Sequence, residues 1–539
     1  MKDRKLIAVS LFAYALFMAC LLGIPNVTTA GPVEGSRNLE RVGIGTTSDS
    51  QVDLGPYSKL APWPDTDDNY LYSGCYDPAP LATSPGASQC FMTIDLKNPQ
   101  KPVRLATVYA FDPVASPQPP LNHPVWKDPK LASLPVKEPC DTFKDPDVVN
   151  GSKPPTCWDR GWNTHTHYVS YHLNVLAVNQ ERWRTGTNTQ AGYHGVKFYD
   201  ISDRARPKFL SYWEAPVSDP VNGHYRDAGG AHHFNFDADG HYLYLGTEYK
   251  GFIGKILVIL DVRDPQHPKE VGKWWLPGQK TPEEDASRDW VQQANFSNPV
   301  QLVSGKYTKH VGMHYVTVYG KRAYLSYHQA GLIILDVSDK SKPRFVSRLD
   351  YLVPGFVDPT MPEVMKQFPL DKMAYGNTHS ARLVPGHEGN LLWVTDEYFS
   401  CPYGHLRMVD LRDEKHPKII SHFLTDQNAA CNGSRPADPT RFPKRGPSSH
   451  IGNVWGNDLL FMAWYGMGLR VINIADPYHP VEAGYYEYRI DRDMSPRDDL
   501  TYAGSDTYDV LFGPGGLLYL SDGTAGLRVL KYTGKELQR

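Results

Sequence analysis

Residues 331–349 read GLIILDVSDKSKPRFVSRL, and this segment contains the repeated pattern from which the fold can be predicted. An apolar run leads to Asp336, a short polar segment ends at Pro343, and a second alternating run follows. The period of two on both sides of the polar segment predicts two antiparallel strands joined by a tight turn. The Asp side chain caps such a turn, and the Pro removes a backbone donor just before an outer strand.

The same pattern occurs six times along the chain. The copies are DLKNPQKP from Asp95, DISDRARP from Asp200, DVRDPQHP from Asp261, DVSDKSKP from Asp336, DLRDEKHP from Asp410 and NIADPYHP from Asn473. A seventh copy, GLRVLKYTG from Gly526, keeps the strand and loses the turn. Two further strands precede the central copy, at 314–320 and 322–327. Four antiparallel strands in each of seven units predict an all-β fold, a seven-bladed β-propeller.

The last unit lacks an outer strand after its third one. The segment LERVGIG at 39–45 resembles the outer-strand segment PKEVGKW at 268–274. We therefore expect residues 39–45 to complete the seventh blade and close the ring, which removes its exposed edges. The propeller then spans residues 31–539 as a single domain, with long loops on one face.

Composition restricts the classes of function. The chain has 539 residues, of which 21% are charged and 41% hydrophobic, and its formal net charge is −3. These values are typical of a folded globular protein. No run of five or more Lys or Arg residues occurs, so nucleic acid is not expected as a partner.

The first thirty residues have the order of a secretory signal peptide. Residues 2–5 are charged, an apolar run extends from Leu6 to Ile24, and small residues follow at 28–30. We predict cleavage after this segment, no membrane span in the mature chain, and a periplasmic or secreted location. An uncleaved membrane anchor is the alternative.

Six cysteines remain after residue 30, and an even number in an exported chain indicates disulfide bonds. Sequence does not determine their pairing. Pairing between neighbours would close one loop each, in the combinations Cys75–Cys90, Cys140–Cys157 and Cys401–Cys431.

The units resemble the LVIVD repeat family of exported bacterial propellers, for example in GLRVINIADPYHPVEAGYY at 468–486. The resemblance covers essentially the whole mature chain and implies the propeller fold. It implies no particular activity, because propellers host many unrelated functions.

Five histidines occupy equivalent places in five units. His167, His233, His314 and His450 each lie nine residues before the first core position of the following strand, and His379 takes the same place if the intervening turn carries a small insertion. The start of each innermost strand faces one rim of the channel, so we expect these imidazoles to converge on the ring axis. His165 shares the strand face of His167, and His232 and His310 are close enough to join the cluster.

Neutral imidazoles gathered at one point are typical ligands of transition metals. We therefore predict a metal site whose ligands are His165, His167, His233, His314, His379 and His450. Typical LVIVD units have small residues at these places, so this chain departs from the family pattern there. The alternative is that the histidines only fill a water-filled channel and hydrogen-bond to water and backbone.

Other polar residues fall in the loops that open on the same rim. Glu248, His328, Glu397 and Asp522 are the predicted proton-handling residues. Aromatic residues of these segments, such as Tyr465, either form substrate walls or pack against long loops. Two groups of histidines are expected to be uninvolved: the turn residues His267, His416 and His479 on the opposite face, and His387, His405 and His422 as single surface or loop residues.

These patterns favour an exported, metal-dependent oxidoreductase that acts on a small molecule at the channel mouth and passes electrons to a periplasmic acceptor. Copper is the favoured metal, by analogy with propeller oxidoreductases that bind copper through histidines, and iron or zinc are alternatives. Two other functions stay open: a zinc- or iron-dependent hydrolase or lyase at the same site, and a non-catalytic surface propeller that binds a protein or glycan.

Overall fold

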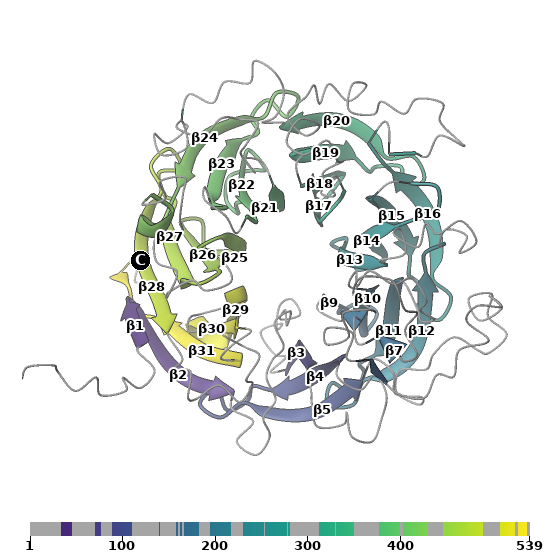
Figure 1. Cartoon of the computed structure of the whole chain (residues 1–539), viewed down its shortest axis with the longest axis horizontal. Helices are drawn as coiled ribbons and strands as arrows, with labels where there is room; N and C mark the ends of the chain where they lie inside the picture. Colours follow the sequence, from purple (N-terminus) through teal and green to yellow (C-terminus); the bar gives the residue numbers. More distant parts are fainter. Residues whose placement is uncertain are drawn as a thin grey trace, which may run out of the picture.

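A computed structural model describes eighteen stretches and one single residue of the chain: residues 34–45, 70–76, 89–109, 139–140, 158–159, 162–163, 166–182, 195–216, 230–252, 254–276, 279–280, 312–328, 330–349, 360, 377–398, 403–429, 446–488, 507–522 and 526–535. Seven β-sheets are arranged in a ring around a central axis (Figure 1). The predicted seven-bladed propeller is confirmed.

In each complete blade the strands pair in the order in which they occur, and the first strand is innermost (Figure 1). The second blade contains β9 (His167–Ser170), β10 (Val175–Arg182), β11 (Gly195–Asp200) and β12 (Lys208–Glu214). The third contains β13 (Ala231–Phe236), β14 (Tyr242–Glu248), β15 (Lys255–Asp261) and β16 (Lys269–Trp274). The fourth contains β17 (Tyr315–Tyr319), β18 (Arg322–Ser326), β19 (Leu332–Asp336) and β20 (Arg344–Leu349).

The remaining blades follow the same plan. The fifth contains β21 (Thr378–Leu383), β22 (Leu391–Asp396), β23 (Leu406–Asp410) and β24 (Lys418–Phe423), after which the short helix α7 (Asp426–Ala429) follows. The sixth contains β25 (Ser449–Trp455), β26 (Leu459–Trp464), β27 (Gly468–Asn473) and β28 (Val481–Tyr488). The seventh begins with β29 (Thr507–Gly513), β30 (Leu517–Asp522) and β31 (Gly526–Tyr532).

The N-terminal strands close the ring. The outer strand β2 (Leu39–Gly45) pairs antiparallel with β31 of the seventh blade, with Leu39 opposite Tyr532. This confirms the predicted closure. The preceding strand β1 (Glu34–Arg37) adds a fifth strand to the sixth blade by pairing with β28. One N-terminal segment therefore joins two adjacent blades.

The first blade shows three strands among its described residues: β3 (Tyr70–Tyr76), β4 (Gln89–Asp95) and β5 (Val103–Tyr109). Cys75 of β3 lies directly opposite Cys90 of β4 in the register, so one of the suggested neighbour pairs occupies facing backbone positions. Beyond this blade, the short segments β6 (Pro139–Cys140) and β7 (Trp158–Asp159) pair with each other, and β8 (Trp162–Asn163) pairs with β10. The other cysteines of the suggested pairs, Cys157, Cys401 and Cys431, lie outside the described residues.

The predicted signal peptide, residues 1–30, also lies outside the described residues. None of the helices in the described part of the chain is long and apolar enough to span a membrane.

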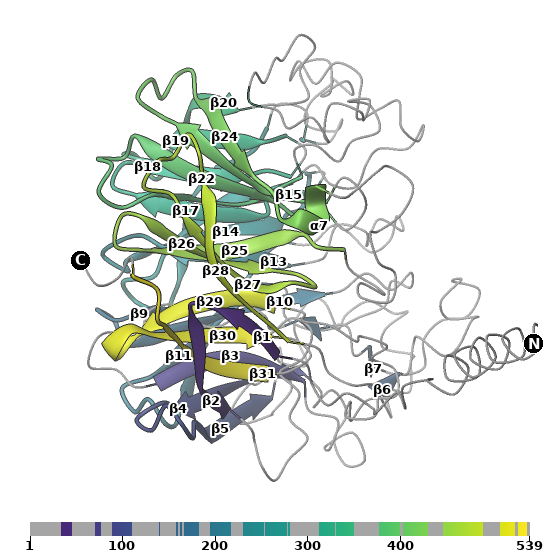
Figure 2. The same ribbon diagram turned by 90° about the vertical axis from the view of Figure 1, so that its left-hand side faces the viewer.

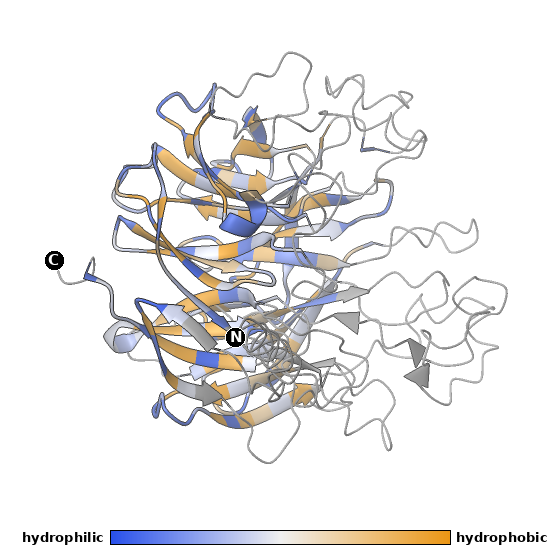
Figure 3. Ribbon diagram, turned by 60° about the vertical axis from the view of Figure 1, so that its left-hand side comes forward, coloured by the Kyte–Doolittle hydropathy of each residue, from blue (hydrophilic) through white to orange (hydrophobic). Residues whose placement is uncertain are grey.

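The repeated turn has one hydrogen-bond pattern in all six copies. Its first residue accepts a hydrogen bond through a side-chain oxygen from the backbone N–H two residues later, at 2.8–3.1 Å, in Asp95, Asp200, Asp261, Asp336, Asp410 and Asn473. This is the side-chain cap that the sequence pattern predicts. Apolar strand positions and polar turns therefore alternate around the molecule (Figure 3).

Apolar side chains fill the space between neighbouring blades. Leu257 and Ile259 of β15, for example, form one buried cluster with Val316 and Leu325 of the fourth blade. Such clusters hold the sheets face to face and form the core of the ring. The strands run across the thickness of the ring when it is viewed from the side (Figure 2).

Candidate metal centre

The structure places the five predicted histidines at the start of innermost strands. His167 begins β9, His314 directly precedes β17, and His233, His379 and His450 lie within the first three residues of β13, β21 and β25. All five side chains are buried. Sevenfold repetition thus brings residues that are far apart in sequence to one end of the ring axis.

Local irregularities in three of these strands affect the histidines. The pairing register of β13 shifts between Ala231 and Phe234, and the same kind of shift surrounds His379 in β21 and His450 in β25. Such a bulge interrupts the alternation of side chains and redirects the residues within it. This explains why His232 and His233, although adjacent in sequence, have ring centroids only 4.7 Å apart.

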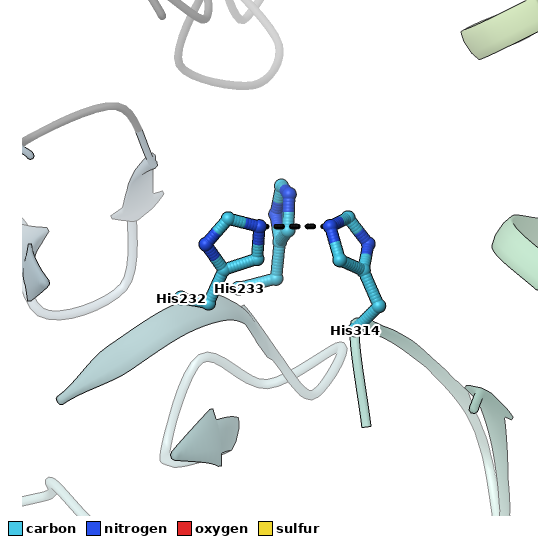
Figure 4. A group of neighbouring side chains, drawn as sticks. All are labelled: His232, His233 and His314. Atoms are coloured by element: carbon cyan, nitrogen blue, oxygen red, sulfur yellow. Dashed lines mark hydrogen bonds between the residues drawn. The ribbon is translucent and has the colours of Figure 1, made fainter. Parts of the chain in front are cut away.

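Three imidazoles form the first part of the cluster. His232 Nε2 and His314 Nε2 lie 2.7 Å apart, and the rings of His233 and His314 are 4.8 Å apart between centroids (Figure 4). Each of the three offers a nitrogen within 4.8 Å of the other two. His232, which the sequence only suggested as an addition to the cluster, is therefore a full member.

The cluster continues through the next two blades as an arc. The ring centroid of His379 lies 4.1 Å from that of His314, and the centroid of His450 lies 4.2 Å beyond it. His328 packs on the same ring system, with its centroid 4.7 Å from that of His314. Six imidazoles thus follow one another around the end of the axis: His232, His233, His314, His328, His379 and His450.

One carboxylate faces the second half of this arc. Glu397 Oε2 lies 3.6 Å from His379 Nε2, and Glu397 Oε1 lies 3.9 Å from His450 Nε2. The hydroxyl of the buried Tyr465 donates a hydrogen bond to Glu397 Oε1 at 3.0 Å, and the Tyr465 ring packs 4.7 Å from that of His450. Tyr465 therefore orients the carboxylate as well as packing in the rim.

Within the described part of the chain, two groups of three donors are compact enough for a metal ion. One is His232, His233 and His314, and the other is His314, His379 and Glu397; in each, the donor atoms lie within 4.8 Å of one another. His314 belongs to both groups. It is therefore the residue through which the two halves of the arc meet.

Hydrogen bonds at Nδ1 orient three of the rings. His314 Nδ1 donates to the backbone oxygen of His379 at 3.2 Å, and His450 Nδ1 donates to the backbone oxygen of Tyr508. His379 Nδ1 lies 2.7 Å from the Ser380 hydroxyl. Because a carbonyl oxygen only accepts, Nδ1 of His314 and His450 carries the proton, and the lone pair of each ring is on Nε2. This is the arrangement of a histidine that binds a metal through Nε2.

The electrostatics of the arc keep His314 neutral. Burial lowers the pKa of His314 well below its usual value, and the neighbouring imidazoles of His379, His232, His328 and His233 lower it further. A proton on this ring would lose hydration and be repelled by any proton on its neighbours. At neutral pH His314 therefore holds the form of imidazole that ligates metals.

A layer of hydrogen-bonded polar side chains lies one to three residues after the histidines on the same innermost strands. The hydroxyls of Tyr168 and Tyr315 are 2.7 Å apart, and Arg382 Nη2 donates to the Tyr315 hydroxyl at 2.5 Å. Arg382 also donates to Asn453 Oδ1 of the sixth blade. This network connects the innermost strands of four blades next to the imidazoles, since the Tyr315 ring is 5.0 Å from that of His233. It supports the positions of those strands.

The other predicted site residues are not part of the compact donor groups. His167 is buried with its ring 5.9 Å from that of Phe91, while Glu248 ends β14 and Asp522 ends β30, where it accepts a hydrogen bond from Thr507. None of these three belongs to either compact group of donors in the described residues. His165 and His310 lie outside the described residues.

The expectation for His405 is wrong. This residue is buried instead of being at the surface, and its Nε2 lies 2.9 Å from Nδ1 of His422. Burial, with the positive charge of Arg407 and the neighbouring His422, lowers the pKa of His405 well below its usual value. His405 directly precedes β23 (Leu406–Asp410) and lies two residues before the buried Arg407, and this spacing, which puts two residues of an extended chain on one face, was the available signal. The three turn histidines do lie in the repeated turns, where each bonds an Asp three residues earlier: His267, His416 and His479.

The donor set fits a transition metal. Six imidazoles and one carboxylate suit copper, zinc or iron, and their nitrogens are held by the backbone of separate blades. Magnesium and calcium prefer oxygen ligands and are disfavoured here. The compact grouping of buried donors is the structural observation that a simple water-filled channel would not require.

Comparison with known proteins identifies the repeat. Residues 314–350, a range that includes the four strands β17–β20 of the fourth blade, match the LVIVD repeat. No curated protein sequence matches the chain.

Several solved propellers are similar in overall arrangement. The periplasmic gluconolactonase PpgL of Pseudomonas aeruginosa is 11% identical over 80% of this chain and 87% of its own, with a TM-score of 0.43. A putative 6-phosphogluconolactonase of Bacteroides uniformis is 10% identical over 78% and 82%, with a TM-score of 0.41. The Cps50 (Swd1) β-propeller domain of Myceliophteria thermophila is 9% identical over 93% and 99%, with a TM-score of 0.44. At these identities and TM-scores none of them bears on the activity of this chain.

Proposed function

We propose that this chain is an exported metal-dependent oxidoreductase that acts on a small molecule at the mouth of the propeller channel, with copper as the favoured metal. The observation that carries the proposal is the arc of six imidazoles centred on His314, a residue that belongs to both compact donor groups. Burying adjacent imidazoles side by side gives the fold no evident packing benefit over apolar residues. Metal ligation is the role that this residue type in this arrangement serves best.

Copper is favoured by the donors and by the proposed location. Imidazole nitrogen is a preferred ligand of copper, and copper has the highest affinity for such sites among the divalent first-row metals. When bound, copper supplies one-electron exchange with a substrate and with a periplasmic electron acceptor. Iron and zinc are the other metals that the donor set accommodates.

The chain itself provides the groups that handle protons. Glu397 lies between His379 and His450 and is hydrogen-bonded by Tyr465, so its carboxylate is held in place to accept a substrate proton. His328, packed on His314, is the second such group. Glu248 and Asp522 are retained only as more distant candidates, because they are not in the compact donor groups.

A zinc- or iron-dependent hydrolase or lyase is the second candidate. Glu397 favours it, since a carboxylate 3.6 Å from a ligating imidazole can either bind the metal or act as general base toward a bound water. Such an enzyme would use the same residues without electron transfer. The identity of the bound metal separates the two candidates.

Elemental analysis of the full chain matured in a bacterial periplasm tests the proposal. We expect bound copper with an electron paramagnetic resonance or visible signal, and we expect His314→Ala to lower the metal content to half of the wild-type value or less. The melting temperature of the chelated variant should stay within a few degrees of the chelated wild type, because His314 precedes its strand and is outside the apolar clusters. His267→Ala, in an exposed turn, is the matched control and should keep its metal.

Other outcomes have definite meanings. Stoichiometric zinc would support the hydrolase or lyase. Absence of metal from the wild type, with melting unchanged by chelation, would contradict both enzymes and leave a surface propeller that binds a protein or glycan. If His314→Ala fails to fold, His379→Ala provides the same test from the neighbouring blade.

A further inference from the structure

The arc of imidazoles is too long for all of its rings to bind a single metal ion. A first-row metal bonds imidazole nitrogen at about 2.0–2.1 Å, so two donors on one ion are separated by no more than about 4.2 Å. The described residues contain two compact groups, and neither includes both His233 and His379, whose ring centroids are 6.1 Å apart on either side of His314. The donors therefore divide into two sets.

His314 can serve only one of these sets through a nitrogen that faces the arc. Its Nδ1 donates to the backbone oxygen of His379, which leaves Nε2, and Nε2 lies 2.7 Å from His232 Nε2. This contact places His314 with His232 and His233. The second set keeps His379 and Glu397, and His450 lies beside it with its Nε2 3.9 Å from Glu397 Oε1.

We propose that the arc binds two transition-metal ions in adjacent compartments, a conclusion that rests on the metal centre proposed above. The first compartment is all imidazole and consists of His232, His233 and His314. The second contains a carboxylate and is formed by His379 and Glu397, with His450 next to the other carboxylate oxygen. His328, packed on His314, lies beside the first compartment.

The two compartments differ in chemistry. Three neutral imidazoles bring no charge to the first, whereas Glu397 brings a negative charge to the second. Carboxylate oxygen is a harder donor than imidazole, so the second compartment is the better one for zinc or iron and the first suits copper. Tyr465, through its hydrogen bond to Glu397, orients the second compartment alone.

Metal stoichiometry tests the proposal without any assay of activity. The full chain is stripped with a chelator, loaded with excess Cu²⁺ or Zn²⁺ alone, desalted and analysed for metal per chain. We expect two ions per wild-type chain and one ion in each of two variants, His233→Ala for the first compartment and His379→Ala for the second. His267→Ala is the control and should retain two ions.

Electron paramagnetic resonance of the copper-loaded proteins gives an independent reading. Two neighbouring Cu²⁺ ions should broaden or weaken the wild-type signal, and each single-compartment variant should show the sharp signal of an isolated ion.

One ion per wild-type chain, or loss of all metal in both folded variants, would overturn the two-ion proposal while leaving a metal centre in place. No bound metal at all would instead overturn the proposed function. Glu397→Gln, which preserves side-chain size, replaces His379→Ala if that variant fails to fold.

Discussion

The same side chain has two roles in this protein, and its hydrogen-bond partners distinguish them. In the arc, His314 and His450 donate through Nδ1 to backbone oxygens, which places the lone pair of each ring on Nε2. In the repeated turns, exposed histidines such as His267 bond instead to a nearby Asp side chain. Burial together with a backbone acceptor therefore separates candidate ligands from turn histidines, and residue type alone does not.

The buried His405 predicts how stability depends on pH in the metal-free protein. Its pKa is lowered in the folded state, so between that lowered value and about 6.5 the unfolded chain binds a proton that the folded chain does not. Lowering the pH through this window therefore favours unfolding, by at most about 1.4 kcal/mol per pH unit for one group. We expect urea midpoints, measured in EDTA, to fall from pH 7.5 to pH 5.

The variant His405→Gln isolates this contribution. Glutamine keeps polar atoms next to Arg407 but does not titrate, so the slope of stability with pH should be shallower than in the wild type. His314, whose pKa is lowered for similar reasons, accounts for part of the remaining slope. An identical pH profile for wild type and His405→Gln would contradict the assignment.

At the scale of the element, the outermost strand of each blade carries a small residue where the next blade's turn approaches. Ser347 of β20 donates through its hydroxyl to the backbone oxygen of Glu414, and Ser421 of β24 does the same to Pro477. Gly272 of β16 takes the corresponding place next to Lys340. The contact between these neighbouring blades therefore depends on the small residue of the outermost strand, whose position cannot be read from the spacing of the turns alone.

Gly272→Ala should weaken the contact between the third and fourth blades. A Cβ at this position would lie 1.9 Å from the backbone oxygen of Lys340, which cannot be accommodated without moving the strand or the turn. We expect destabilisation of about 1–3 kcal/mol, measured as a lower melting temperature. Metal content should not change, because β16 is outermost and the arc is innermost (Figure 1).

Ser347→Ala is the matched variant at the equivalent position of the fourth blade. It removes one hydrogen bond and creates no clash, so its cost should be smaller, about 1 kcal/mol. Equal melting temperatures for Gly272→Ala and wild type would show that the turn can move freely.

For the whole molecule, ring closure depends on a strand from the far end of the chain. Leu39 of β2 is buried in the seventh blade in one cluster with Leu530 and Val510. Strand β1 then continues onto the sixth blade. The first and last parts of the chain therefore hold two blades together, and all the imidazoles of the arc depend on that closed ring for their relative positions.

Leu39→Ala should loosen the closure. Deleting a buried Leu side chain costs about 2–5 kcal/mol, whereas Glu40→Ala, at an exposed position of the same strand, should be within about 0.5 kcal/mol of the wild type. Urea unfolding measures the difference, and limited proteolysis should show earlier cleavage around β2 and β31 in Leu39→Ala. Equal stability of the two variants would mean that another contact closes the ring.

The sequence alone was enough to predict the seven-bladed ring, its closing strand, the capped turns and the place of five histidines in the blades. These features follow from local patterns: a period of two, an Asp followed by Pro, and a constant spacing before the second strand. Which polar residues lie next to one another could be seen only in the folded structure. His232 joins the cluster because the register of β13 shifts, and Glu397, hydrogen-bonded by Tyr465, lies beside the imidazoles, whereas Glu248 and Asp522 do not belong to the compact groups. His167 is also outside these groups, and His405 is buried. The strand pattern specifies which residues lie near the axis. The distances between their donor atoms depend instead on bulges and on how separate blades pack, and differences of a few ångströms in these distances determine which atoms can bind the same ion.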